Sequence, residues 1–254
     1  MDTQRLEIAR LFHRTGFGPK PGEFAEALRA GVVPTRSKIL SAPSTVSFVT
    51  PPVLTDLGPR PEPNSPDVVE FSRQLRYQTQ QLFLWWLDEM VASPHTLQEK
   101  MTWFWHGHWA TSIGKVNYAL PMLNQNVTMR KYALGNFTEF SKAMFSDGAL
   151  QVWLDGQENT VKAPNENFSR EMMELFVLGV NRYTETDVKE LARSFTGYQV
   201  SRTNGVVTYN ARRRDTAPVT VLGRTAAMSP DEVITHLVSQ NNSAQFIAER
   251  IWYR

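Results

Sequence analysis

The chain has 254 residues, a formal net charge of +2, 41% hydrophobic residues and 20% charged residues. This composition is ordinary for a globular protein with a sizeable core, and the small net charge gives no reason to expect a nucleic-acid partner. Because the chain has no cysteine, disulfides, thiolate nucleophiles and zinc–thiolate sites are excluded.

Neither a signal peptide nor a membrane span is expected. The N-terminus has no uninterrupted apolar segment, and no window reaches the roughly 18 apolar residues of a spanning helix. We therefore expect a soluble, cytoplasmic protein. A helical pattern with Ser243 as its expected N-cap reaches Arg254 without a C-cap signal, which indicates a protein that continues beyond this residue.

The beginning of the chain predicts a helical arm and a connector. Apolar spacing predicts short helices over residues 3–14 and 21–30. Residues 43–66 contain seven prolines and are expected to be extended and irregular. We therefore predict two parts, an arm with its proline-rich connector over 1–66 and a helical core domain over 67–254.

The core domain carries a strong helical signal followed by a short alternating segment. Helices are expected over about 67–93, from 96, and over about 116–134, 137–146, 166–178, 184–197 and from 230, with side-chain N-caps at Thr96, Asn136, Asn165, Thr184 and Ser229. Residues 198–222 alternate and contain Asn204-Gly205, a strong hairpin signal. The expected fold is mainly α, an irregular multi-helix bundle with a small β-hairpin insertion around 198–222.

The expected helix 166–178 is apolar nearly all round, so its carboxylates need partners if it is buried. One interpretation pairs Glu171 and Glu174 with arginines such as Arg170 and Arg193. The other makes the two glutamates metal ligands or acid–base groups that face a pocket. Glutamates three residues apart occur in carboxylate-bridged metal sites, but those sites use Glu-x-x-His pairs, and the spacing here is Glu-x-x-Glu.

The segment "WFWHGHW" places two histidines around Gly107. In an unbroken helix, His106 and His108 lie about 160° apart and cannot bind the same metal ion. If the chain instead becomes extended at Gly107, both imidazoles lie on one side, as a metal site requires. Glycine permits this break without requiring it. The alternative is that both are satisfied core histidines.

Several motifs together resemble one bacterial family. "HRTGFGP", "EKMTWFWHGHW", "RKYALGNFTEF" and "APNENFSREMMELFVLGVNRYTETDVKELARSFTGY" are similar to the uncharacterised family catalogued as domain of unknown function 1800. The resemblance covers nearly the whole chain and implies no established reaction. Members are usually longer, and many are exported.

The resemblance also implies site residues. The family's His, Asn, Arg and Glu positions correspond here to His13, His106, His108, Asn165, Glu166, Asn167, Arg170, Glu171 and Glu174. The chain departs from the family's pattern after the expected hairpin. Arg214 stands where a histidine is expected, and Val219 stands where a lysine is expected.

Two functional hypotheses follow. The first is a helical enzyme of hydrolytic or redox chemistry with a divalent metal as cofactor. In that hypothesis His106, His108, Glu171 and Glu174 are metal ligands and, with Arg170, catalytic residues, and His13, Asn165, Glu166 and Asn167 bind the substrate. The second is a non-catalytic binding or scaffold protein in which these residues form a buried polar network. No nucleic-acid partner and no membrane span is expected in either.

Overall fold

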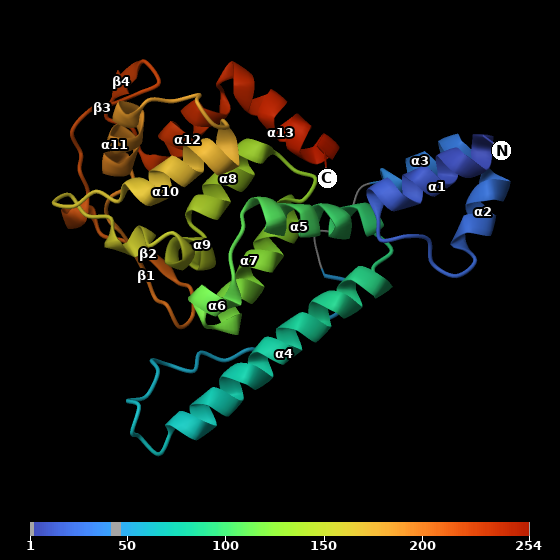
Figure 1. The fold of residues 1–254 in the computed structure, drawn as a ribbon, viewed down its shortest axis with the longest axis horizontal. Coiled ribbons are helices and arrows are strands. Elements are labelled where there is room, and N and C mark those ends of the chain that lie inside the picture. Colours follow the sequence, from blue (N-terminus) through green and yellow to red (C-terminus); the bar gives the residue numbers. More distant parts are fainter. Residues whose placement is uncertain (1–2, 42–46, 254) are drawn as a thin grey trace.

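The computed structural model describes residues 3–41 and 47–253. Within these ranges the protein is mainly α-helical, which confirms the predicted fold class at that level. Figure 1 shows a small N-terminal lobe, one long helix that crosses beneath the rest, and a larger body that contains the remaining helices and two β-hairpins.

The N-terminal lobe consists of three short helices, α1 (Thr3–Thr15), α2 (Glu23–Ala30) and α3 (Val32–Ile39). Ile8, Phe12 and Ala27 form a small core of their own between these helices. The two predicted helices of this region are confirmed. The third was not predicted, because its β-branched residues and Pro34 give a weak helical signal.

The 25-residue helix α4 (Val68–Ala92) is accompanied by the connector that precedes it. The Gln78 side-chain nitrogen donates to the Thr55 carbonyl oxygen at 3.1 Å, and Trp85 Nε1 donates to the Val49 carbonyl oxygen at 3.0 Å. Residues 47–67 form no helix or strand, as the prolines predict. Residues 43–46 of the predicted connector lie outside the described residues.

Five helices follow in the body: α5 (Thr96–His108), α6 (Ile113–Val116), α7 (Ala119–Tyr132), α8 (Phe137–Phe145) and α9 (Gly148–Trp153). The prediction of one helix over 116–134 is wrong at its start. Asn117 adopts a left-handed conformation with φ of 68°, which ends α6 and lets α7 begin in a new direction. The short α9 was not predicted.

The second half of the body is built around a helix that changes its winding. α10 (Glu166–Glu171) continues into a π-helical segment, η2 (Met172–Val177), and the later helices are α11 (Glu185–Ser194), α12 (Pro230–Val238) and α13 (Asn241–Tyr253). The Leu178 amide bonds the Met173 carbonyl oxygen at 2.8 Å, five residues back. Single-turn π segments of this kind are frequent at functional sites.

Residues 198–226 form two small hairpins where one was predicted. β1 (Tyr198–Val200) pairs antiparallel with β2 (Val207–Tyr209), and β3 (Val219–Val221) pairs antiparallel with β4 (Arg224–Ala226). Tyr198 lies opposite Tyr209 in the first hairpin. The second hairpin turns at Leu222 and Gly223, both with positive φ, as a two-residue turn of this type requires.

Most of the predicted helix starts are confirmed. Asn136 and Asn165 accept a backbone amide bond at the starts of α8 and α10, and complete capping boxes open α11 at Thr184 and α12 at Ser229. Two cap predictions are wrong. Thr96 is the first residue of α5, and His95 occupies the N-cap position. Ser243 lies inside α13, which begins at Asn241.

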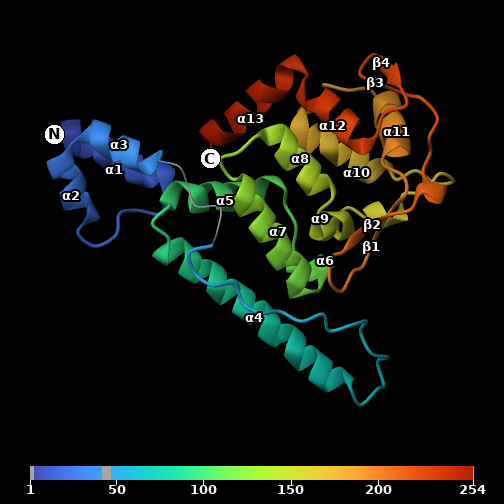
Figure 2. The same cartoon turned by 180° about the vertical axis from the view of Figure 1, so that it is seen from behind.

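Two apolar clusters fill the body. The larger lies where α5, α8, η2 and α12 meet and includes Trp105, Phe140, Phe176 and Leu237. The smaller lies between α4, α7 and α9, whose ribbons Figure 2 shows from behind. Over residues 3–41 and 47–253, none of the helices combines the length and apolarity needed to cross a bilayer.

The lobe and the body touch along a short boundary. Lys20 Nζ donates to the carbonyl oxygens of Ala92 and Ser93, each at 2.8 Å, at the end of α4. Phe17 packs edge-on against Trp103 of α5. The connector, by contrast, is packed into the smaller body cluster through Leu54. The division at residue 66 remains a prediction.

Candidate functional site

The two histidines of "WFWHGHW" diverge because α5 is unbroken through Gly107. Of the two alternatives, the continuous helix is therefore the one observed, and the two imidazoles face different parts of the molecule. His108 enters the larger apolar cluster, and His106 lines a cavity on the side of α4. The arrangement with both imidazoles on one side is not formed.

His108 is a buried histidine of the core. Its Nε2 lies 2.9 Å from the carbonyl oxygen of Phe176 in η2. Because a carbonyl oxygen only accepts, Nε2 carries the proton and donates. The ring stacks on Phe104 and meets Trp109 edge-on. This bond therefore joins α5 to the π-helical segment across the main core.

Glu171, Glu174 and Arg170 lie at the edge of the body and not in the cavity beside His106. Glu174 accepts a hydrogen bond from the Tyr183 hydroxyl. Arg170 binds Glu185 through two bonds of 2.7 Å, so its main partner is neither predicted glutamate. Burial, followed by the negative charge of Glu174, raises the pKa of the Glu171 carboxyl group.

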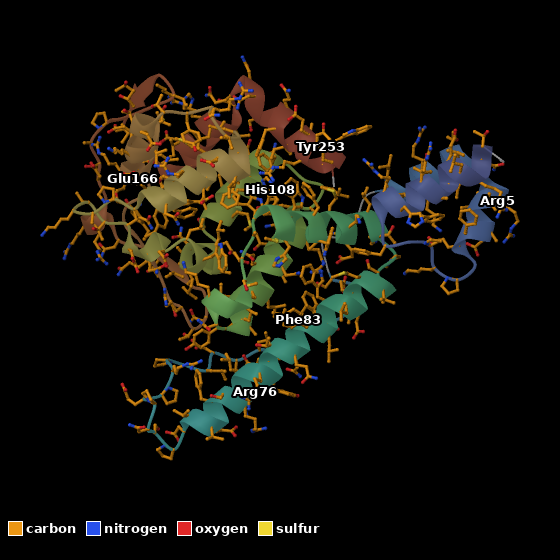
Figure 3. All side chains as sticks on the ribbon, viewed as in Figure 1. Arg5, Arg76, Phe83, His108, Glu166 and Tyr253 are labelled. Atoms are coloured by element: carbon orange, nitrogen blue, oxygen red, sulfur yellow. The ribbon has the colours of Figure 1, made fainter. Side chains whose placement is uncertain are left out.

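The predicted substrate-binding residues hold the chain around α10. Asn165 caps the helix through its oxygen and donates its amide nitrogen to the carbonyl oxygens of Leu154 and Asp155. The amide nitrogen of Asn167 also points to Leu154 O, at 3.5 Å. Glu166 lies 3.7 Å from Arg170 at the outer end of α10, well away from Phe83 of α4 (Figure 3).

The other sequence candidates lie elsewhere. His13 is exposed near the end of α1, in the N-terminal lobe. Arg193 pairs with Glu190 and Asp215, each at 2.8 Å, and with neither predicted glutamate. Arg214 donates to the Met228 carbonyl oxygen at 2.7 Å, and Val219 is buried in β3. The structure thus distributes the predicted site residues over separate regions.

The described residues contain no group of three or more His, Asp or Glu side chains arranged to hold one metal ion. A four-ligand site of His106, His108, Glu171 and Glu174 needs all four side chains to converge. Because these four side chains lie apart, the described residues do not form that metal site.

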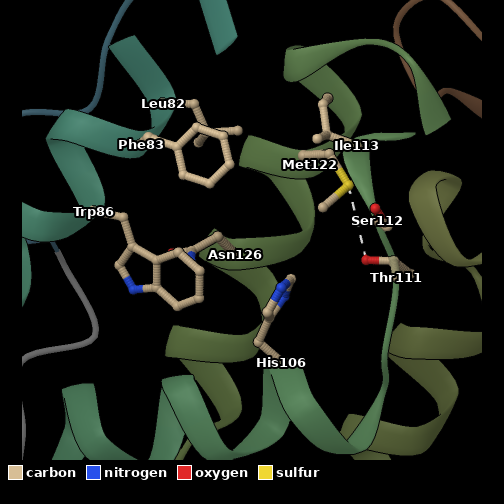
Figure 4. Close-up of a pocket in the computed structure, with 9 residues that line it drawn as sticks. All are labelled: Leu82, Phe83, Trp86, His106, Thr111, Ser112, Ile113, Met122 and Asn126. Carbon is tan, nitrogen blue, oxygen red and sulfur yellow. Dashed lines mark hydrogen bonds between the residues drawn. The ribbon is translucent and has the colours of Figure 1, made fainter. Parts of the chain in front are cut away.

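One of the predicted site residues, His106, does line a cavity. It has a volume of about 150 Å³ and lies between α4, the end of α5, and α6 and α7. Figure 4 shows Leu82, Phe83 and Trp86 on one side, Thr111, Ser112 and Ile113 on the other, with His106 at the base and Met122 and Asn126 behind. The lining is mostly apolar with a few polar atoms, which is typical of small-molecule sites.

His106 is partly buried, and its ring packs edge-on against Trp86 with the ring centres 5.1 Å apart. Burial lowers the pKa of the His106 imidazole, since a charged ring loses hydration there. The imidazole is therefore neutral at neutral pH. A neutral imidazole offers a ligand one hydrogen-bond donor and one acceptor.

A buried ion pair lies behind one wall of the cavity. Arg130 binds Glu99 through two bonds of 2.8 and 2.9 Å, and both side chains are 1% exposed. Arg130 also donates to Asn126 Oδ1 at 2.7 Å and lies over the ring of Trp85. Glu89 of α4 is 3.9 Å from the same guanidinium. This network joins α4, α5 and α7.

A second polar chain lies behind the opposite wall. The Thr111 hydroxyl donates to Gln125 Oε1 at 2.6 Å, and Gln125 Nε2 donates to Asp147 Oδ1 at 2.7 Å. The Leu150 amide donates to the same carboxylate oxygen at 2.8 Å. Burial raises the pKa of Asp147 to about 7. All three side chains are buried.

Sequence reasoning missed most of this site. It singled out His106 but not Trp86, Thr111 or Asn126, because these residues come from three segments that only the tertiary packing brings together. One signal was present in the sequence. Arg130 stands in an otherwise mostly uncharged helix, and a charge in such a position needs a buried partner.

Comparisons with known proteins give one match. A family described as "Protein of unknown function (DUF1800)" matches residues 10–254. No curated protein and no solved structure matched the chain. The match covers every residue that lines the cavity and assigns no role to any of them.

Proposed function

Since the chain belongs to the DUF1800 family, whose description names no function, we propose its function from the geometry of its own residues. The family resemblance inferred from the motifs is confirmed. We propose that the protein is a helical binding protein and that the cavity beside His106 holds a small, mostly apolar ligand.

The cavity itself is the observation that carries this proposal. An empty apolar cavity of about 150 Å³ in another protein takes up benzene, so a volume of this size suits one aromatic ring. Burying roughly 150 Å² of ligand surface at about 25 cal/mol per Å² gives about 4 kcal/mol, which corresponds to a dissociation constant on the order of 1 mM for a bare ring.

The binding hypothesis has more support than the enzyme hypothesis. At the edge of the body, Arg170 bonds to Glu185 and Glu174 accepts a hydrogen bond from Tyr183, so neither of these two predicted catalytic residues lines the cavity. The two networks behind the cavity are bonded within the protein and join four helices, as a rigid binding scaffold requires. Divalent-metal catalysis stays a hypothesis that no grouping of the described side chains supports.

The test is a titration with toluene followed by NMR of the histidine side chains. We expect the His106 imidazole resonances to shift and saturate in the millimolar range, and those of exposed His13 to stay unchanged. Ile113→Trp fills the cavity and should abolish the shift. Ile251→Trp adds the same side chain on exposed α13 and should leave it intact.

An unchanged His106 spectrum in the folded, unmodified protein would overturn the proposal. Saturable shifts at His106 that persist in Ile113→Trp would also overturn it, because the ligand would then bind outside this cavity.

A further inference from the structure

Hydrogen bonds behind the cavity wall determine which of its polar atoms donate and which accept, and this chain of bonds begins at Asp147. At pH values above its pKa of about 7, Asp147 is an ionised carboxylate, which only accepts hydrogen bonds. Asp147 Oδ1 takes one from the Leu150 amide and one from the Gln125 side-chain nitrogen. This bond determines which way the Gln125 amide faces, because the nitrogen must point to Asp147 and the oxygen must point away.

The orientation of Gln125 determines the position of the Thr111 proton. Gln125 Oε1 can only accept, so the Thr111 hydroxyl at 2.6 Å donates its single proton to it. The sulfur of Met122 at 3.8 Å is a much weaker acceptor and does not compete. What Thr111 presents to the cavity is therefore an oxygen that accepts hydrogen bonds and cannot donate one.

Asn126 is oriented in the same way from the other wall. Its Oδ1 accepts from Arg130 Nη1 at 2.7 Å, so its remaining polar group is the amide nitrogen, a donor. Arg130 is itself held by Glu99. Among the described residues, the cavity lining includes no lysine, arginine, aspartate or glutamate, and His106 is neutral, so a bound anion would lack a charged partner there.

We infer that this cavity selects neutral one-ring molecules that carry a hydroxyl or N–H donor directed at the Thr111 oxygen, a phenol-like class of ligand. This inference rests on the proposed function and adds to it the chemical character of the ligand. The apolar walls accept the ring, and Thr111 satisfies a donor that would otherwise lose its water. Carboxylates such as benzoate are disfavoured, because the described lining residues provide no positive charge to pair with them.

The test compares phenol with toluene by titration, with His106 resonances as the readout. Measurement at pH 8 keeps Asp147 ionised, since its pKa is about 7, and keeps phenol neutral, since phenols titrate near about 10. The quantity measured is the ratio of the toluene to the phenol dissociation constant. One net hydrogen bond corresponds to roughly a fivefold contribution to that ratio.

Thr111→Val removes the hydroxyl with little change of shape and should lower the ratio about fivefold, chiefly through weaker phenol binding. Thr111→Ser keeps the hydroxyl and should leave the ratio near that of the unmodified protein. Benzoate should leave the His106 resonances unchanged. An equal ratio in the valine and serine variants, or saturable benzoate binding, would overturn the inference.

Anisole gives a second measurement that needs no variant, in case the valine variant does not fold. It retains the ring and the oxygen but has no proton to donate, so we expect it to bind more weakly than phenol. Anisole that binds as tightly as phenol would refute the donor requirement. Toluene binding without any preference for phenol would refute this inference and leave the proposed function standing. If none of these aromatic ligands shifts the His106 resonances, both the inference and the proposed function are refuted.

Discussion

Asp147 is a buried carboxyl group at the start of α9, between the amide of Gln125 and the backbone of Leu150. Its hydrogen bonds favour the charged form, but burial is the larger effect and raises its pKa to about 7. The folded protein therefore holds this proton at pH values where the unfolded chain, with a pKa near 3.8, has lost it. Protonation of Asp147 is thus coupled to stability.

The coupling predicts the direction of a pH effect. As pH rises from about 4 to about 7, the unfolded state binds fewer protons at this site than the folded state, so the free energy of unfolding falls. The loss attributable to Asp147 is on the order of 4 kcal/mol and is complete above pH 7. Asp147→Asn keeps the shape and the acceptor oxygen, and its stability should lack this component.

The measurement is urea unfolding of both proteins at pH 5 and pH 8. We expect the unmodified protein to lose more stability between these values than Asp147→Asn does. An identical pH dependence in the two proteins would contradict the raised pKa. Asp67→Asn, at an exposed position before α4, serves as the control and should follow the unmodified protein.

The candidate site could be predicted from the sequence only in part. Helix geometry correctly showed that His106 and His108 diverge if the helix continues through Gly107. Nothing local to the sequence shows that Trp86 and Thr111 meet His106, since that contact depends on how α4 packs against α5 and α7. Interactions between distant segments, and not local preference, create the cavity.

At the scale of single helices, the start of α11 shows how local chemistry directs the fold. Thr184 accepts the Asp187 amide, and the Asp187 carboxylate accepts the Thr184 amide in return. The second oxygen of Asp187 accepts the Leu222 amide at 2.7 Å. One capping box therefore begins α11 and also ties the second hairpin to it.

Thr184→Ala should lower the free energy of unfolding by about 1 kcal/mol, because the Asp187 amide loses its side-chain acceptor. Thr186→Ala, two residues along on the same exposed turn, removes the same atoms without breaking a cap and should change stability little. Chemical denaturation monitored by circular dichroism measures both. Equal effects of the two substitutions would show that the cap is not responsible.

Helix boundaries were predictable where a side chain creates them and unpredictable where the backbone does. The caps at Asn136, Thr184 and Ser229 are visible as residue patterns and are confirmed. Thr96 fits the same pattern, but it is the first residue of α5, and His95 occupies the N-cap position. α6 ends because Asn117 adopts a left-handed conformation. Asparagine tolerates this conformation, but an asparagine in the sequence does not by itself predict it.

At the scale of the whole molecule, Glu89 links parts that are distant in sequence. Its two carboxylate oxygens accept the backbone amides of Phe48 and Val49, each at 2.6 Å, and it lies near Arg130 of α7. The connector, α4 and α7 are therefore held at one buried carboxylate. This contact explains how a proline-rich segment without regular structure stays in place beside α4.

Glu89→Gln should release part of the connector, because the amide of glutamine has one acceptor oxygen for two backbone donors. We expect the Phe48 or Val49 amide to exchange its hydrogen at least about tenfold faster in the variant. Hydrogen–deuterium exchange measures this directly. Glu62→Gln, an exposed substitution in the same connector, is the control. Unchanged exchange at both amides would show that other contacts hold the connector.

The two polar chains behind the cavity have a consequence for how this protein diverges in evolution. The residues that shape the cavity, such as Phe83 and Ile113, are separate from those that orient its polar atoms, Asp147 and Arg130. Single substitutions of wall residues can therefore change the size of the cavity, while the orientation of its polar atoms stays the same. Reversing the direction of these polar atoms, by contrast, requires replacement of both members of a buried bonded pair, because a change in one member alone leaves a buried polar group unpaired.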